Sequence, residues 1–254
     1  MQLHYLEVGE GPGVLILHGL FGQARNWAAV TKGLAEDYRL VSVDLPNHGR
    51  SPWTGDVSYP SVAANVAEFM TGHKLKGAAV VGHSMGGKVA MALALTRPDL
   101  VGGLVVVDIA PVRYAHGIRH HMEAMQALPL ERVTSRESAD EMLAGAVDDP
   151  AVRALLLSNL ARDRGGYAWR INLDGLHDGA DVIHGFPDID GAQYEGRTLF
   201  VAGEISDFIE EEHKELIGSL FPNAEHAVVE GAGHWVHTDK PKETIDLLRR
   251  FLAG

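Results

Sequence analysis

The chain has 254 residues, of which 46% are apolar and 22% charged, so it can bury a full hydrophobic core and is not expected to be disordered. Its 34 acidic and 22 basic residues give a net charge of -12, which argues against nucleic acid and anionic lipid as partners. The absence of cysteine excludes a disulfide frame and a thiol nucleophile. Neither a signal-peptide pattern nor a bilayer-length apolar run is found, so we expect a cytoplasmic protein without a membrane span.

Short apolar runs rich in β-branched residues predict buried strands at residues 13–17, 40–43, 78–81, 104–107, 198–201 and 226–229. Helical patterns separate most of them, at residues 26–37, 61–72, 85–96 and 242–252. This alternation predicts an α/β fold with a mostly parallel, doubly wound sheet. Residues 3–8 are expected to add an antiparallel strand at one edge.

The alternation stops between Pro111 and about Gly191. In that segment the helical patterns follow one another without a convincing strand between them, at residues 113–128, 136–146 and 151–162. We expect a helical cap inserted over the carboxyl ends of the strands, where open α/β sheets bind ligands. The predicted organisation is a core of residues 1–111 and 191–254 and a cap of residues 112–190.

Residues 80–87, VVGHSMGG, follow a predicted strand and open a predicted helix. This is the context of a G-x-S-x-G nucleophile elbow, in which a strained turn holds the central serine. Gly82 and Gly86 would avoid clashes with the serine backbone, and the amide of Met85 would lie at a helix N-terminus, where it can bind an oxyanion. A bare G-x-S-x-G string can arise by chance in a chain with 29 glycines, but this placement predicts Ser84 as a nucleophile.

The loop after the strand at 13–17, HGLFG, is expected to supply the second oxyanion donor, and we assign this role to the amide of Leu20. Phe21 is predicted to line the substrate pocket with Tyr114 and Trp235, although core packing would explain aromatic residues equally well. Tyr167 and Trp169 are further candidates for the pocket wall.

Residues 44–51, DLPNHGRS, resemble a D-x-x-G-x-G-x-S loop with Asn47 in the place of a glycine. Asparagine tolerates a positive φ better than most residues that carry a side chain, so this exchange is physically mild. We interpret the loop as structural and His48 as a turn residue, not a catalyst.

The predicted base is His234, in the segment GAGHWVH between the last predicted strand and the final helix. The order of a serine followed by a histidine near the carboxyl terminus is that of this type of triad, and the neighbouring glycines allow the imidazole to approach the serine hydroxyl. His237 is a rival three residues further on. Because it lies nearer to the start of the helix, we expect it to pack or cap.

Taken together, these motifs resemble the alpha/beta-hydrolase superfamily over nearly the whole chain, and more narrowly its branch of small, YbfF-like esterases and acyl thioesterases. The resemblance rests on HGLFG with Asn26 and Trp27, PNHGRSP, GHSMGGKVAM, the VDIAP segment that contains Asp108, and GAGHWVH. It implies hydrolysis of short- to medium-chain acyl esters or thioesters through an acyl-enzyme, with no metal and no organic cofactor. Ser84 argues against the dehalogenase and epoxide-hydrolase members, which use an aspartate at this position.

Two aspartates compete for the role of the acid that orients the base. In the commonest arrangement the acid follows the strand at 198–201, three residues beyond a glycine, but here Gly203 puts Ser206 at that place and Asp207 one residue later. Asp108 ends the neighbouring strand at the edge where the elbow emerges, and the YbfF-like branch places its acid in the equivalent segment. We predict Asp108 and keep Asp207 as the alternative, with capping of a helix at 208–220 as its structural role.

His116 and His120 stand four residues apart on a predicted cap helix, a spacing that can hold zinc. No glutamate completes an H-E-x-x-H pattern and no cysteine assists, so we expect surface histidines and no metal site. The acidic run at 210–212 is interpreted as the solvated first turn of a helix.

Two other classes of function stay open beside ester hydrolysis. Some relatives use the same triad in carbon–carbon bond hydrolysis or lyase chemistry, and others are small-molecule receptors with residual hydrolase activity. A lyase needs cationic groups that hold an enolate or a carboxylate, for which Arg113 and Arg119 are the candidates. The motifs do not distinguish an ester from a thioester, and they leave the oligomeric state open.

Overall fold

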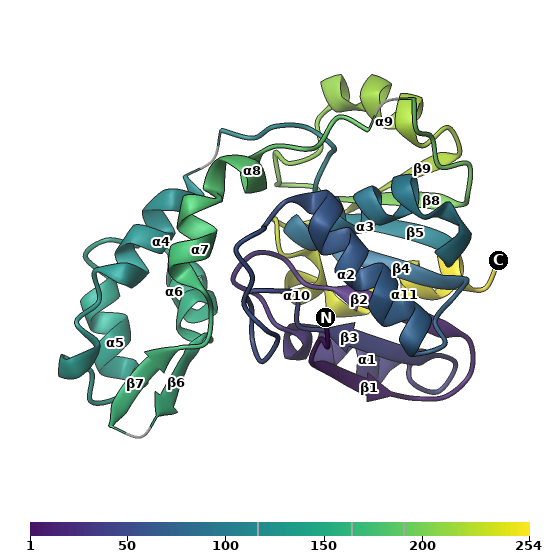
Figure 1. Cartoon of the computed structure of the whole chain (residues 1–254). Helices are drawn as coiled ribbons and strands as arrows, with labels where there is room; N and C mark the ends of the chain where they lie inside the picture. The colour runs from purple at the N-terminus through teal and green to yellow at the C-terminus, as the bar shows by residue number, and fades with distance from the viewer. Residues whose placement is uncertain (116, 164, 190) are drawn as a thin grey trace.

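The structure is a computed structural model that describes residues 1–115, 117–163, 165–189 and 191–254, and a seven-stranded sheet forms its centre (Figure 1). The strands lie in the order β1-β3-β2-β4-β5-β8-β9. Their bounds are Tyr5–Val8 (β1), Gly13–Leu17 (β2), Arg39–Val43 (β3), Ala78–His83 (β4), Val101–Val107 (β5), Thr198–Gly203 (β8) and Ala224–Val229 (β9). Only β1 is antiparallel to its neighbour, at the edge beside β3, so the predicted mostly parallel sheet with an antiparallel edge strand is confirmed.

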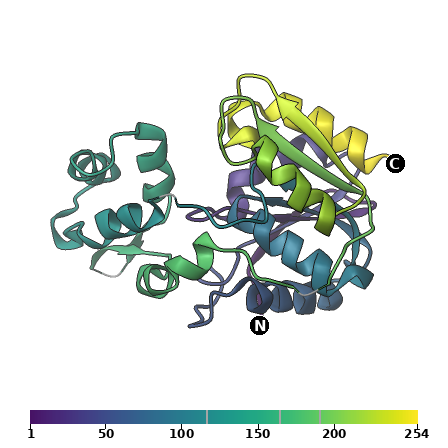
Figure 2. The same cartoon turned by 90° about the horizontal axis from the view of Figure 1, so that it is seen from above.

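Helices cover both faces of the sheet (Figure 2). On one face α2 (Tyr59–Gly72) packs on α3 (Met85–Thr96), which is buried from Met85 to Leu95. On the other face α1 (Ala28–Leu34) packs on α11 (Pro241–Leu252). The buried residues of α11, Thr244, Leu248 and Phe251, recur at the helical period, so this helix turns one apolar stripe to the sheet.

Shorter elements complete the part of the chain around the sheet. The 3-10 turns are η1 (Ala24–Trp27), η2 (Pro98–Leu100) and η4 (Glu211–His213), and the remaining helices are α9 (Lys214–Leu220) and α10 (Val236–Asp239). A helix was expected at 208–220, but the chain forms the 3-10 turn η4 first, and α9 begins only at Lys214. The N-cap of η4 is Glu210 and that of α9 is His213, so the expected capping by Asp207 was wrong.

The segment between β5 and β8 lies beside the carboxyl ends of the strands and forms a separate group of elements in both views (Figures 1 and 2). It contains α4 (Ile118–Gln126), η3 (Leu130–Arg132), α5 (Arg136–Leu143), α6 (Pro150–Leu157), β6 (Leu160–Asp163), β7 (Gly166–Trp169), α7 (Leu173–Asp178) and α8 (Ala180–His184). We call residues 112–190 the insertion. Within the described residues, no helix is both long enough and apolar enough to cross a membrane.

Two details of the insertion differ from the sequence prediction. The expected helix at 151–162 ends at Leu157, and β6 then pairs with β7 as an antiparallel hairpin. The expectation that no strand interrupts the helices was therefore wrong, since four-residue strands are too short to show a clear period. The helix expected at 113–128 starts only at Ile118, because Tyr114 N donates to His184 O and holds this part of the chain against the end of α8.

Candidate active site

Ser84 lies in the sharp turn between β4 and α3, with a φ of 52° and a ψ of -121°. A side chain at Gly82 would place its Cβ 2.3 Å from Gly86 O, and one at Gly86 would meet His18 O at 2.4 Å. Both positions therefore require glycine, as the elbow interpretation predicted. The turn presents the serine at the carboxyl edge of the sheet, where a ligand can reach it.

The register between β4 and β5 brings the predicted nucleophile and the predicted acid together. His83 is paired with Val107, so Ser84 and Asp108 leave adjacent strands at the same level. Ser84 N donates to Val107 O at 3.0 Å, and Asp108 N donates to Val201 O at 2.8 Å. Asp108 is fully buried and has a φ of 52°, so the surrounding main chain holds it in a strained conformation.

A continuous chain of hydrogen bonds connects these residues to His234. His234 Nδ1 lies 2.8 Å from Asp108 Oδ2, and His234 Nε2 lies 3.0 Å from Ser84 Oγ. The carboxylate accepts the Nδ1 proton, which leaves the lone pair on Nε2 to accept the hydroxyl of Ser84. This tautomer is the one that a general base requires.

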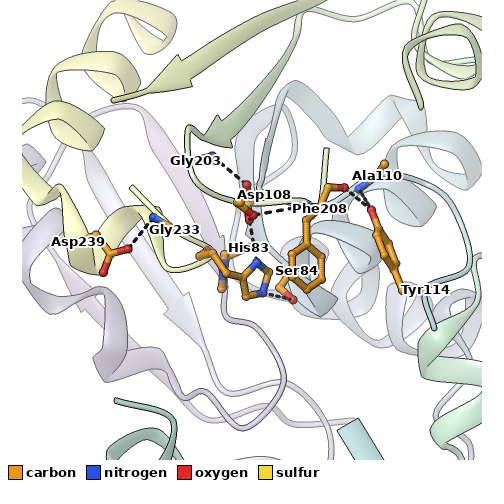
Figure 3. Close-up of polar contacts among 11 residues, drawn as sticks. His83, Ser84, Asp108, Ala110, Tyr114, Gly203, Phe208, Gly233 and Asp239 are labelled. Carbon is orange, nitrogen blue, oxygen red and sulfur yellow. Dashed lines mark hydrogen bonds and ion pairs between the residues drawn. The ribbon is translucent and has the colours of Figure 1, made fainter. Parts of the chain in front are cut away.

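Asp108 accepts hydrogen bonds at both of its oxygens (Figure 3). Gly203 N donates to Oδ1 at 2.9 Å, and the hydroxyl of Ser206 donates to Oδ2, the oxygen that also binds His234. Ser206 stands three residues beyond Gly203, which is the place of the acid in the commonest arrangement of the triad. Asp207, the alternative acid, follows it with an exposed side chain.

Two further contacts hold the loop that carries His234, the predicted base. The ring of Phe208 stacks on the imidazole of His234 with centroids 3.9 Å apart, and His83 Nε2 donates to His234 O at 2.8 Å. Burial lowers the pKa of His83 well below the usual value for histidine, so the ring stays neutral. Gly233 N donates to Asp239 Oδ2 at 2.9 Å (Figure 3), which joins the loop to α10.

The two histidines interpreted as structural are buried. His237 stacks on Trp27 with centroids 4.2 Å apart, and burial lowers its pKa to about 3. Burial also lowers the pKa of His48 to about 3, and its Nδ1 donates to Pro46 O at 3.0 Å. Asn47 has the positive φ, 69°, that its place in the loop predicted.

Leu20 and Met85, the predicted oxyanion donors, line the same cavity as Ser84. Met85 is the first residue of α3, and the amide of a first helical residue has no acceptor within its own helix. The loop that carries Leu20 approaches the elbow closely, because a Cβ at Gly19 would lie 2.8 Å from His83 Nδ1. Asn159 of the insertion, which is fully buried, donates to Phe21 O at 2.8 Å and supports this loop.

Ser84 opens into a cavity of about 460 Å³ between the core and the insertion. Phe21, Tyr114 and Trp235, the predicted pocket residues, all line it. Its other apolar lining residues are Leu20, Tyr59, Met85, Ile109, Ile118, Val152, Leu155, Ile183 and Phe208. Tyr167 and Trp169, the further candidates, do not line it. Both belong to β7, and Trp169 Nε1 donates to Met125 O at the end of α4.

Tyr114 connects the cavity wall to the main chain of the core. Its hydroxyl accepts a hydrogen bond from Ala110 N at 2.7 Å and donates one to Phe208 O at 2.5 Å (Figure 3).

A second cavity, of about 360 Å³, adjoins the first and shares Leu20, His83, Leu155 and Trp235 with it. Its other walls include the polar side chains of Asn26, Ser158, Thr238 and Asp239.

The zinc hypothesis gains no geometric support. His116 lies outside the described residues, and His120 Nε2 donates to Ala146 O at 2.7 Å. In the described part of the chain, the group of side chains close enough to share a metal ion is Glu210, Glu212 and His213, in which both carboxylates are exposed. These glutamates belong to the solvated acidic start of η4 that the sequence predicted.

Four residues of this region were not predicted as functional. Ser206 and Phe208 come from the loop after β8, Asn159 from the insertion, and Lys88 from α3. Ser206 had a signal in the sequence, since a polar residue stands three positions beyond Gly203. The others depend on contacts between segments far apart in the chain.

The chain belongs to the alpha/beta hydrolase fold family, whose model matches residues 12–241. It is 40% identical over 250 residues to the sn-1-specific diacylglycerol lipase ABHD11 of Mus musculus, which covers 95% of this chain and 81% of the relative. It is 32% identical over 242 residues to the esterase YbfF of Escherichia coli (strain K12), with 94% and 92% covered. A solved structure, described as a marine microorganism esterase, has a TM-score of 0.94, an identity of 34% and coverage of 98% and 99%.

These relatives confirm the YbfF-like branch that the motifs indicated. The protein is a carboxylic ester hydrolase. The resemblance extends over nearly the whole length of this chain and most of each relative, so the insertion as well as the sheet takes part in it.

Proposed function

We propose that the protein is a serine esterase that cleaves short- to medium-chain carboxylic esters or acyl thioesters with Ser84 as nucleophile, His234 as base and Asp108 as acid. The observation that carries this proposal is the continuous hydrogen-bond chain from Asp108 through His234 to Ser84, at the wall of a largely apolar cavity. Asp207 is the less favoured acid, because its neighbour Ser206 occupies the space beside Asp108.

In the first half of the reaction, His234 Nε2 takes the hydroxyl proton while Ser84 Oγ bonds to the carbonyl carbon. The carbonyl oxygen becomes an oxyanion, which the amides of Leu20 and Met85 bind. The carbonyl then re-forms, the bond to the leaving oxygen or sulfur breaks, and the imidazolium gives that atom its proton. Buried Asp108 stabilises the imidazolium and remains a carboxylate throughout.

The second half of the reaction hydrolyses the acyl-enzyme. His234 removes a proton from water, whose oxygen bonds to the acyl carbon, and the same two amides bind the second oxyanion. When the intermediate collapses, the bond to Ser84 Oγ breaks and the oxygen takes its proton back from the imidazolium. The products are a carboxylic acid and the free enzyme, so no metal or organic cofactor is needed.

The two adjoining cavities suggest where the parts of an ester lie. The larger one extends from Ser84 along α3 under the apolar residues of the insertion, which suits an acyl chain. The smaller one lies beyond Leu20 and Trp235 and has more polar walls, which suits an alcohol or thiol leaving group. In this proposal residues 1–111 and 191–254 form the catalytic core, and residues 112–190 form a cap that shapes both cavities.

The lyase and receptor alternatives have less support. A lyase needs a cation near the reacting carbonyl, but Arg113 and Arg119 are not among the lining residues of the larger cavity. Lys88 does line it, but its ammonium donates to three main-chain carbonyls. Arg119 instead binds Asp181 at 3.0 Å and donates to His177 O at 3.1 Å. The receptor alternative has less support because the similar proteins are named as a lipase and esterases.

The test is a turnover panel of aryl esters and acyl-coenzyme A thioesters of graded chain length, run on the wild type and on Ser84→Ala. We expect hydrolysis of short and medium acyl groups by the wild type, and a loss of at least about 10⁴-fold in the variant. A fluorophosphonate probe should label Ser84 and no other residue. Full activity of Ser84→Ala would exclude the proposed nucleophile.

A further inference from the structure

A buried lysine lies one helical turn after Ser84. Lys88 is on α3, its side chain is only 2% exposed, and it contributes to the wall of the larger cavity. Its ammonium donates to three main-chain carbonyls: Val112 O at 2.8 Å, His184 O at 2.9 Å and Gly185 O at 2.6 Å. The catalytic steps above give this group no role, yet burial of a cation is unfavourable unless its surroundings compensate it.

The three acceptors lie where the chain crosses between the core and the insertion. Val112 is the first residue of the insertion, His184 ends α8, and Gly185 caps α8 at the start of the segment that leads to β8. The two crossings also contact each other, because Tyr114 N donates to His184 O at 3.0 Å. One side chain of the core thus holds both connections at the same point.

The chemistry of the ammonium fits this position. It has three N–H donors, which match the three carbonyl acceptors, whereas a neutral amine has only two. Among the described residues, no carboxylate oxygen lies within 4.0 Å of Lys88 Nζ, the distance that an ion pair requires. The faces of Tyr114 and Tyr59 lie 4.9 Å and 5.6 Å from the nitrogen, distances at which aromatic rings stabilise a cation.

The site also lies close to the apolar wall of the cavity. Tyr59 donates from its hydroxyl to Ile183 O at 2.7 Å, and the side chain of Ile183 lines the cavity beside Lys88. The position of α8, and with it this part of the wall, therefore depends on the same cluster. A long acyl chain would contact this wall, whereas an acetyl group at Ser84 would not extend so far.

We propose that Lys88 is a positioning residue that pins both crossings of the chain, fixes the insertion over the acyl cavity and so sets the acyl-chain length that the enzyme prefers. This inference rests on the proposed function, since it concerns the acyl cavity of the same site. Lys88 acts through the position of Ile183 and its neighbours and takes no part in the proton transfers.

The protonation of Lys88 gives a second way to observe the same role. Burial, assisted by the nearby charge of Arg113, lowers the pKa of Lys88 to about 7. The ionisable groups that face the nitrogen are the phenols of Tyr59 and Tyr114, and burial raises the pKa of both, so they stay neutral. As the pH rises through about 7, the ammonium loses one donor and one of the three carbonyls loses its partner.

The experiment compares wild type, Lys88→Met and Lys88→Gln in the hydrolysis of p-nitrophenyl acetate and p-nitrophenyl decanoate. Methionine keeps the length of the stem and removes every donor, and glutamine keeps a neutral donor group. We expect the ratio of kcat/KM for decanoate to that for acetate to fall about tenfold in Lys88→Met, through a higher KM for decanoate. The matched control is Lys32→Met on α1, an exposed lysine on the opposite face of the sheet, which should keep the wild-type ratio.

The pH dependence of this ratio completes the test. In the wild type the ratio should decrease as the pH rises from 6 to 8.5, and in Lys88→Met it should be independent of pH. A folded Lys88→Met variant with the wild-type ratio and pH profile would overturn the inference, even if its melting temperature fell. If Lys88→Met does not fold, the same criteria apply to Lys88→Gln and to the wild-type pH profile. Absence of ester hydrolysis in the wild type would instead exclude the proposed function.

Discussion

The two sides of the active-site cavity are held in different ways. On the core side, Ser84 and Asp108 leave adjacent parallel strands in strained positive-φ conformations, and the register of the sheet determines their separation. On the insertion side, the apolar side chains of α4, α6 and α8 form the wall, and a few buried tethers such as Asn159 and Lys88 connect them to the core. The chemistry therefore depends on the main chain of the sheet, whereas the fit of the substrate depends on side-chain packing that small changes can shift.

The largest effect is expected on the core side, from a substitution of the proposed acid. Asp108→Asn keeps the shape but removes the charge that stabilises the imidazolium, so we expect kcat to fall by about 10³- to 10⁴-fold. Asp207→Asn is the matched control, since Asp207 is exposed on the neighbouring loop, and it should stay within about threefold of the wild type. The measurement is the hydrolysis of a short aryl ester. The opposite pattern would identify Asp207 as the acid.

A smaller effect on the core side is expected from Ser206, whose hydroxyl donates to the oxygen of Asp108 that binds His234. Ser206→Ala removes one hydrogen bond to a charged group, worth about 1.5–3 kcal/mol, so kcat should decrease by about one to two orders of magnitude. Ser206→Thr keeps the hydroxyl and should restore most of the activity. Equal activity of the alanine variant and the wild type would show that this bond does not support the reaction.

On the insertion side, filling the cavity should change the substrate preference and leave the chemistry intact. Val152→Phe on α6 adds volume to the wall, so kcat/KM for a decanoyl ester should fall by about tenfold while that for an acetyl ester changes little. Val182→Phe on α8 is the control, because Val182 is 46% exposed and does not line the cavity. Equal losses for both esters in Val152→Phe would contradict the assignment of this cavity to the acyl chain.

The mildest test concerns stability in acid. The pKa of buried His237 is about 3, below the value near 6.5 of an unfolded histidine, so the unfolded chain binds the proton first. The stability contributed by neutral His237 is therefore present above about pH 6.5 and is lost as the pH falls toward 3, by about 2 kcal/mol at pH 5. His237→Phe keeps a ring on Trp27 and should reduce the change in unfolding free energy between pH 7 and pH 5. An unchanged difference in urea titrations would refute this explanation.

The sequence predicts the core side far better than the insertion side, and the reason is physical. The strands, the elbow and the positive φ of Asn47 each follow from local rules of periodicity and turn geometry. The hairpin β6–β7 was missed because four-residue strands give almost no periodic signal. The roles of Lys88 and Phe208 could not be inferred, since each depends on the approach of segments far apart in the chain.

The proposed acid, Asp108, stands at the end of β5, and this position affects how the enzyme can diversify. Because Asp108 and Ser84 both belong to the rigid centre of the sheet, the loop after β8 need not supply the carboxylate. Within that loop Ser206 donates a hydrogen bond to Asp108, while Phe208 stacks on His234 and lines the cavity. Substitutions in this loop other than at Ser206 can therefore change the wall of the cavity without removing a member of the proposed hydrogen-bond chain, which makes this loop a site where new specificities can evolve.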